Sequence, residues 1–110
     1  MAIWTMVKYR PLEGCVDKFL DDAKRLEDNH PDKNARLSIW LKTEEDHVIQ
    51  ITARKTIDQL IDNQDYGLDW LDTVDHLLEK DEEGSRTVAY SGFEVDTLRR
   101  EFGLNLKFSD

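Results

Sequence analysis

The chain has 110 residues, 39% hydrophobic and 35% charged, which suits one folded domain with a single core. Its formal charge of −9 argues against a nucleic-acid partner, because phosphate binding depends on clustered Lys and Arg, and it equally disfavours an anionic membrane surface. No apolar run approaches the roughly 20 residues of a membrane-spanning helix. With Cys15 as the single cysteine and no signal-peptide pattern at the N-terminus, we expect a cytoplasmic protein without an internal disulfide.

The first half of the chain predicts a strand, a helix and a hairpin. Residues 2–9 are rich in β-forming side chains and predict a strand. Residues 15–29 place apolar side chains at helical spacing and predict an amphipathic helix that ends before Pro31. The alternating segments 35–42 and 47–54 are joined by a short polar turn, so they predict two antiparallel strands.

The second half predicts another helix and another strand. Thr56 and Gln59 form a capping-box pattern that begins a helix with an apolar stripe reaching position 78. The Tyr66–Gly67 pair predicts a kink or a break in the middle of this helix. Residues 86–95 predict the last strand of the series.

The C-terminal residues carry weaker patterns. Asp96 predicts the start of a short helical turn, and Leu104, Leu106 and Phe108 alternate as in a fifth strand. We therefore expect a domain over residues 1–95 and a C-terminal extension over residues 96–110.

The order of these elements is β-α-β-β-α-β, which predicts an α+β, ferredoxin-like sandwich with an antiparallel sheet and both helices on one face. We expect the helix side to take the purely apolar positions of the strands: Ile3, Thr5, Val7, Leu37, Ile39, Leu41, Ile49, Ile51 and Ala53. The opposite side then receives the mixed positions: Trp4, Met6, Lys8, Arg36, Ser38, Trp40, Val48, Gln50, Thr52 and Arg54, with Val88 and Tyr90 if the register agrees.

A sheet face that carries tryptophan, methionine and tyrosine among polar side chains is typical of a protein interface. Soluble monomers rarely expose so large an apolar patch, and two-fold pairing of identical sheets is the commonest way to cover it. We therefore predict a homodimer that closes into an α/β barrel. The predicted interface residues are Trp4, Met6, Trp40, Gln50, Thr52 and Tyr90. The alternative is a monomer whose C-terminal segment covers this face.

Over residues 2–95 the chain resembles the dimeric α/β-barrel superfamily, in particular its antibiotic-biosynthesis-monooxygenase-like branch. The resemblance rests on the segments AIWTMVKYRPLEG, VDKFLDDAKRLEDN, ARLSIWLKTEEDHVIQITAR, TIDQL and TVAYSGFEV. It implies a ligand cavity between the sheet and the helices of each subunit. Members of the branch include cofactor-free oxygenases of polyketide quinones, signal-molecule isomerases and haem-degrading enzymes. The haem-degrading members carry an asparagine where Val7 stands here, and Trp70 and His76 do not match their Trp and His in spacing and phase. The resemblance leaves quinone oxygenation open, because its residue requirements are looser.

Five side chains are candidates for the site. Tyr9 and Arg54 end two strands and could supply a phenol donor and a fixed positive charge to an oxygen-rich or acidic aromatic molecule. Asp75, at the margin of the apolar helix face, is a candidate general base if burial raises its pKa. Trp70 and Tyr66 are the candidate walls of a ligand pocket. The plainer alternatives are core packing for Trp70 and ion pairs for Arg54 and Asp75.

The sequence predicts no metal site and no cofactor. His76 shares a helix face with a stripe of aspartates, which is typical of a solvated surface, and a straight helix splays such carboxylates apart. Two functional hypotheses remain. The first is a small cofactor-independent monooxygenase-like oxidoreductase that acts on or binds a small aromatic or quinone-type molecule. The alternative is a non-catalytic ligand-binding or assembly module of the same barrel type.

Overall fold

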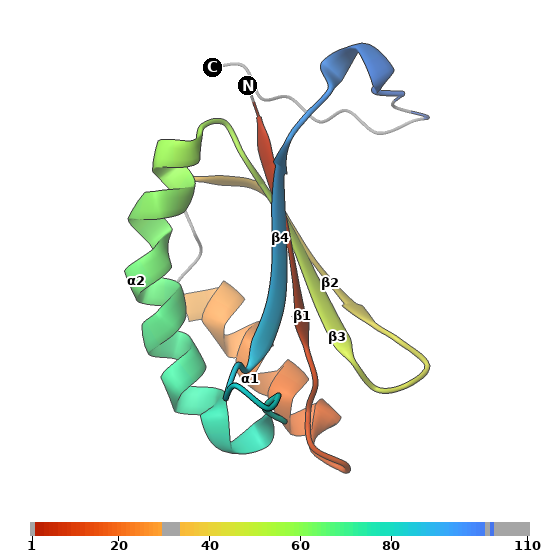
Figure 1. Cartoon of the computed structure of the whole chain (residues 1–110), viewed down its shortest axis with the longest axis vertical. Coiled ribbons are helices and arrows are strands. Elements are labelled where there is room, and N and C mark those ends of the chain that lie inside the picture. The colour runs from red at the N-terminus through yellow and green to blue at the C-terminus, as the bar shows by residue number, and fades with distance from the viewer. Residues whose placement is uncertain (1, 30–33, 101, 103–110) are drawn as a thin grey trace.

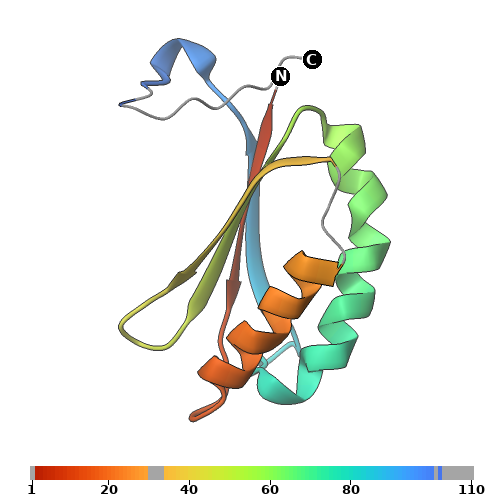
Figure 2. The ribbon, with the colours of Figure 1, turned by 180° about the vertical axis from the view of Figure 1, so that it is seen from behind.

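The computed structural model describes residues 2–29, 34–100 and 102. Its elements, in chain order, are β1 (Ile3–Tyr9), α1 (Val16–Asn29), β2 (Ala35–Lys42), β3 (Val48–Arg54), α2 (Ile57–Val74), the short 3-10 turn η1 (Asp75–Leu77), β4 (Thr87–Phe93) and the 3-10 turn η2 (Asp96–Leu98). The strands form one sheet in the order β2-β3-β1-β4, with every neighbouring pair antiparallel. Both helices lie on one side of this sheet (Figures 1 and 2). The predicted ferredoxin-like sandwich is confirmed.

Helix α2 runs without interruption from Ile57 to Val74, so it does not break into two helices at Tyr66–Gly67. A single glycine inside a helix costs only about 1 kcal/mol relative to alanine. The predicted cap offsets part of this cost, because the Thr56 hydroxyl accepts a hydrogen bond from the Gln59 backbone NH at 3.3 Å. The Gln59 side chain in turn accepts one from the Lys55 NH at 3.1 Å.

The predicted faces are right for β1 and wrong for β2 and β3. Residues that face each other in an antiparallel pair lie on the same side of the sheet. Tyr9, on the helix side, pairs with Val48, and the same register continues through the pairs Val7 with Gln50 and Thr5 with Thr52. In the next pair Gln50 faces Trp40. The mixed side chains of β2 and β3 therefore face the helices.

Trp40, Gln50 and Thr52 are consequently misplaced as interface residues, whereas Trp4, Met6 and Tyr90 lie on the outer side as predicted. The outer side is more apolar than expected. Its other members on β2, β3 and β4 are Leu37, Ile39, Leu41, Ile49, Ile51, Ala53 and Val88. We call these residues, together with Trp4, Met6, Lys8 and Tyr90, the outer face. The apolar positions of β2 and β3 were assigned to the wrong side because a row of apolar side chains can cover a protein interface as well as fill a core.

The core lies at one end of the sandwich, where both helices reach the sheet. It consists of Tyr9, Val16, Phe19, Val48, Val74, Leu77 and Leu78, with Trp40 and Trp70 packed against it. After η1 the chain returns beside the end of β1, where Pro11 and Leu78 form an isolated β-bridge. In Figure 1 this end is at the bottom, where α1 lies close to the sheet, while α2 alone covers the upper part.

After β4 the chain crosses to the side of the sheet opposite the helices (Figure 1). There the carboxylate of Glu94 accepts a hydrogen bond from the Trp4 indole nitrogen at 3.3 Å and forms an ion pair with Arg99. The predicted turn at Asp96 forms as η2, over Asp96–Leu98. The predicted fifth strand at positions 104–108 lies outside the described residues, so the division into a domain and an extension stays a prediction.

Candidate ligand-binding cavity

A cavity of about 660 Å³ separates α2 from the sheet. The helix-facing side chains of all four strands form its floor, and α2 with the end of α1 forms its roof. The floor residues on β1, β3 and β4 are Thr5, Val7, Tyr9, Gln50, Thr52, Arg54, Thr87, Ala89 and Ser91. Its volume falls within the range of about 300–1,000 Å³ that is usual for small-molecule sites.

Four aromatic rings close the end of this cavity toward the core. Tyr9 stacks on Trp40 with ring centroids 5.7 Å apart, and Trp70 meets the edges of both rings at 6.2 Å and 5.9 Å. Phe19, fully buried, lies 5.1 Å from Tyr9 and 5.7 Å from Trp70. These separations are those of favourable aromatic pairs, so the rings hold one another in place. Trp70 and Tyr9 also line the cavity, so a rigid aromatic wall faces any molecule inside it.

Glu27 connects α1 to β2 beside this wall. One oxygen of its carboxylate accepts hydrogen bonds from the Trp40 indole nitrogen and from the Ser38 hydroxyl, each at 3.0 Å. Sequence reasoning missed this residue because its neighbours Lys24 and Asp28 belong to the exposed side of α1. The alternation of β2 offered the signal, since Ser38 and Trp40 share a side and both carry donors.

The phenol of Tyr9 is held protonated. Its ring is 4% exposed, and its hydroxyl donates a hydrogen bond to the Gln50 side-chain oxygen at 3.0 Å. Burial raises the pKa of Tyr9 well above its usual value, and the negative charge of Glu27 raises it further. Tyr9 is therefore a neutral hydrogen-bond donor at physiological pH and is a poor general base.

Arg54 supplies positive charge to the cavity. It is only 5% exposed, and its Nη1 donates to the Thr52 hydroxyl at 3.0 Å. Between β1 and β4, the hydroxyls of Thr5 and Ser91 lie 2.9 Å apart and share a hydrogen bond. The cavity thus combines an aromatic wall with hydroxyl groups and a buried guanidinium, which suits a flat molecule that carries oxygen atoms.

The roof of the cavity explains why it is not filled. The central, sheet-facing stripe of α2 includes Asn63, Gln64 and Gly67 in consecutive turns, and all three line the cavity. Two polar side chains and a glycine cannot pack a dry core, so α2 buries Val74 and leaves the sheet uncovered along its middle turns. The sequence carried this signal as a gap in the apolar stripe between Ile61 and Leu68.

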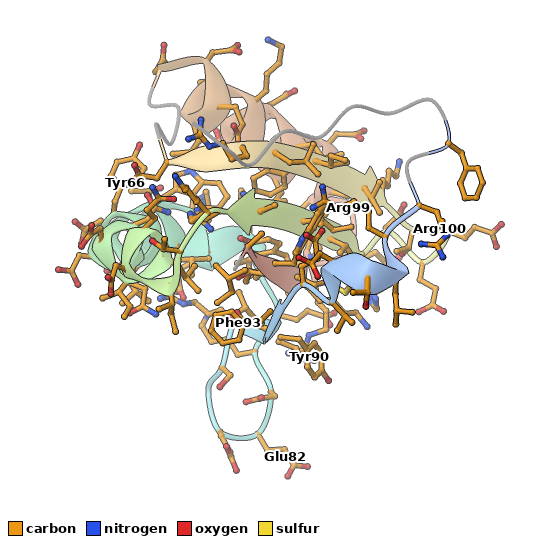
Figure 3. The ribbon with its side chains drawn as sticks, turned by 90° about the horizontal axis from the view of Figure 1, so that it is seen from above. Tyr66, Glu82, Tyr90, Phe93, Arg99 and Arg100 are labelled. Carbon is orange, nitrogen blue, oxygen red and sulfur yellow. The ribbon has the colours of Figure 1, made fainter. Side chains whose placement is uncertain are left out.

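Tyr66 and Trp70 separate the cavity from a second hollow of about 560 Å³ between the two helices. Tyr66 is 39% exposed, and desolvation, with a smaller effect of the Glu27 charge, raises its pKa. Figure 3 shows Tyr66 on the helix side of the molecule and Tyr90 on the other side of the sheet. Both predicted pocket residues, Tyr66 and Trp70, line the cavity, and Trp70 also packs against the core.

Asp75 is wrong as a candidate general base. It lies outside the cavity lining, in η1, where it pairs with Lys80 at 3.2 Å and with Arg86 at 3.3 Å. Arg86 also pairs with Asp72 at 2.8 Å. The hydrogen bond from Lys80, with the nearby Arg86, lowers the pKa of Asp75 instead of raising it. The carboxylate is therefore ionised and structural.

The exposed His76 contributes to the hollow between the helices and is absent from the cavity lining. Among residues 2–29, 34–100 and 102, His, Cys, Asp and Glu side chains form no group of three that could hold a metal ion. Within the same residues, no helix has the length and apolarity required to cross a membrane.

Comparison with known proteins places the fold. No family model and no curated protein matches the sequence. Solved structures do match. Rv0793 from Mycobacterium tuberculosis superposes with a TM-score of 0.70 at 8% identity, over 90% of this chain and 100% of the other. A putative antibiotic biosynthesis monooxygenase from Chloroflexus aurantiacus superposes with a TM-score of 0.69 at 9% identity, over 97% and 100%.

A third structure, Atu4242 from Agrobacterium tumefaciens, superposes less closely, with a TM-score of 0.58 at 14% identity over 82% of this chain and 88% of the other. The chain therefore has a ferredoxin-like α+β fold, which it shares with these three solved structures.

Proposed function

We propose that this protein is a homodimeric, cofactor-independent monooxygenase-like oxidoreductase that acts on a small aromatic or quinone-type molecule bound beneath α2. The observation that carries the proposal is the composition of the cavity. An aromatic wall of Tyr9 and Trp70 lies in the same space as the buried guanidinium of Arg54. A core without a ligand would be expected to fill this space with aliphatic side chains.

The roles of the residues follow from their chemistry. The aromatic wall stacks on the ring system of the ligand, and Arg54 attracts a phenolate or enolate oxygen. A nearby positive charge lowers the pKa of the ligand hydroxyl, which favours the electron-rich anion. Tyr9 stays protonated, and because its proton is donated to Gln50, its oxygen can accept a hydrogen bond from a ligand hydroxyl.

An electron-rich anion of this kind can reduce dioxygen directly. A ring CH₂ group is converted to a carbonyl: one atom of dioxygen becomes the carbonyl oxygen, and the other leaves as water with the two hydrogens. The substrate carbon supplies all the electrons. The protein contributes by binding, by favouring the anion and by excluding water from the reacting carbon.

The homodimer part of the proposal rests on the outer face. Met6, Ile39, Leu41 and Tyr90 are 44%, 40%, 44% and 69% exposed. An apolar surface that extends over four strands is costly to leave in water, and a second copy of the same sheet is a complementary cover. Sheet-to-sheet pairing would leave the cavity of each subunit on the far side of its sheet.

The test uses anthrone, whose ring CH₂ is flanked by two aromatic rings. Binding is followed by quenching of tryptophan fluorescence, and turnover by an oxygen electrode together with absorbance of the quinone. The proposal expects saturable quenching and one molecule of dioxygen consumed for each molecule of quinone formed, above the rate with heat-denatured protein. Binding without consumption would favour the non-catalytic ligand-binding module. Absence of binding by anthrone and related hydroxyarenes would contradict the oxidoreductase and the aromatic-binding module alike, and would favour an assembly module.

A further inference from the structure

We infer that Gly67 sets the size of the ligand that the cavity admits, an inference that rests on the proposed function. Gly67 lies at the centre of the cavity-facing stripe of α2. The residues three and four positions to either side of it, Asn63, Gln64, Trp70 and Leu71, all line the same cavity as Gly67 itself. Side chains at such spacings lie on one face of a helix, so a side chain at position 67 would point into the cavity.

The space in front of Gly67 is open. A Cβ atom built at this position would meet no heavy atom within 4 Å among the described residues, apart from its chain neighbours and the adjacent backbone of its own helix. The backbone does not demand a glycine either, because position 67 lies in the interior of a regular 18-residue helix and is not among the positive-φ glycines. Alanine would favour the helix more than glycine does. The glycine therefore leaves space in the cavity, and the backbone at this position does not require a glycine.

The floor of the cavity, formed by the sheet, also carries several small side chains. They include Thr5, Ala89 and Ser91, on β1 and β4. Thr5 and Ser91 satisfy each other through a hydrogen bond of 2.9 Å. At position 67 the roof carries no side chain, and part of the floor carries only small ones, so the residue at position 67 controls the height of the cavity there. The cavity would admit a broad ring system, and filling position 67 would leave room only for a smaller one.

The experiment compares Gly67→Ala and Gly67→Leu with the wild-type protein and with Asp62→Leu. Asp62 is an exposed residue of α2 outside the lining of both hollows, so it carries the same leucine without entering the cavity. The probes are phenol, 1-naphthol and 1-anthrol, which differ in the number of fused rings. Affinity is measured by tryptophan quenching, and the melting temperature of each variant is recorded.

Gly67→Leu is expected to weaken binding of 1-anthrol by about tenfold or more, because overpacking a filled cavity is costly, while phenol binding changes little. The affinity of Gly67→Ala for 1-anthrol is expected to lie between those of Gly67→Leu and the wild type. Asp62→Leu is expected to bind all the probes as the wild type does. Both Gly67 variants should melt at or above the wild-type temperature. Equal affinity of Gly67→Leu and wild type for 1-anthrol, or a lowered melting temperature of Gly67→Ala, would overturn the inference on Gly67 alone. A wild-type protein that binds none of the probes would instead refute the proposed aromatic-binding function.

Discussion

The indole nitrogen of Trp40 donates a hydrogen bond to the Glu27 carboxylate at 3.0 Å, and this contact joins edge strand β2 to helix α1. The same carboxylate oxygen accepts from Ser38 at the same distance. Two donors on the inner side of β2 thus depend on one acceptor. A partly buried donor that loses its acceptor is costly, so Glu27 is a structural residue of the cavity wall as well as one of its charges.

Glu27→Ala should lower the free energy of unfolding by about 1–3 kcal/mol, because the Trp40 and Ser38 donors lose their partner. Glu27→Gln keeps an acceptor oxygen and should lose less. The matched control is Asp28→Ala, which removes only an exposed pair with Lys24 on the same helix. Urea unfolding measures all three variants. An equal effect of Glu27→Ala and Asp28→Ala would show that the contact contributes nothing.

Tyr9→Phe should reduce the loss of stability at alkaline pH. The folded state raises the pKa of Tyr9 above its usual value of 10.0, so the neutral phenol is favoured by folding. This contribution is complete below pH 10 and is lost as the pH rises above it, because the unfolded chain releases the proton first. Unfolding should be measured between pH 8 and pH 11, with Tyr90→Phe as the exposed control. Parallel curves for wild type and Tyr9→Phe would contradict the assignment.

Neighbouring positions on β2 should respond in opposite ways, because Ile39 lies on the outer face and Trp40 faces the helices. Ile39→Glu should shift the sedimentation of the protein from dimer to monomer and leave its secondary structure intact. Trp40→Ala should instead lower the free energy of unfolding of the subunit by about 3 kcal/mol or more, because it removes a ring from the aromatic cluster. A wild-type protein that sediments as a monomer at micromolar concentration would rule out the proposed dimer.

Arg54→Gln should discriminate between charged and neutral ligands. Affinity for 1-naphthoate should fall by about tenfold, the effect of losing a charge-assisted hydrogen bond, while affinity for naphthalene should change little. The comparison of the two probes within one variant separates the loss of charge from any general loosening of the cavity. An equal loss for both probes would mean that Arg54 only supports the fold.

Asp75→Asn should leave ligand affinity and any oxygen consumption unchanged, since Asp75 pairs with Lys80 and Arg86 outside the cavity lining. Its lowered pKa predicts that the ion pairs contribute to stability above the unfolded pKa near 3.8 and that this contribution is lost as the pH falls below it. At neutral pH the Asp75→Asn variant should therefore have a slightly lower free energy of unfolding than the wild type. The difference should disappear in acid, which unfolding measured across the acidic range would show. A selective loss of turnover in this variant would restore Asp75 as a catalytic candidate.

The order of the elements could be predicted, and so could the bounds of β1, α1, β2 and β3 to within about one residue, because each depends on local patterns. The strand 35–42 has the predicted bounds, and the cap at Thr56 forms with Gln59 as expected. The two sides of the hairpin could not be assigned in this way, because a shift of one residue exchanges them and both sides carry large apolar residues. The pairing of Tyr9 with Val48 across β1 and β3 decides the question, and it is a long-range contact.

The cavity was predictable only in part. Trp70, Tyr66, Tyr9 and Arg54 are suggested by their residue types and lie around one space. Glu27 could not be recognised, because its role depends on the side of β2 that faces α1. The pKa of Asp75 was predicted in the wrong direction, since the partners that determine it come from Lys80 and Arg86, which follow in the next loop.

The glycine in the roof of the cavity has an evolutionary consequence. Because alanine at position 67 would favour the α2 helix and meet no obstacle, stability alone gives no reason to retain the glycine. Lineages that depend on a wide ligand would resist its replacement, and lineages that have lost the ligand would accept it. The residue found at this single site could therefore serve as a marker of which descendants still use the pocket.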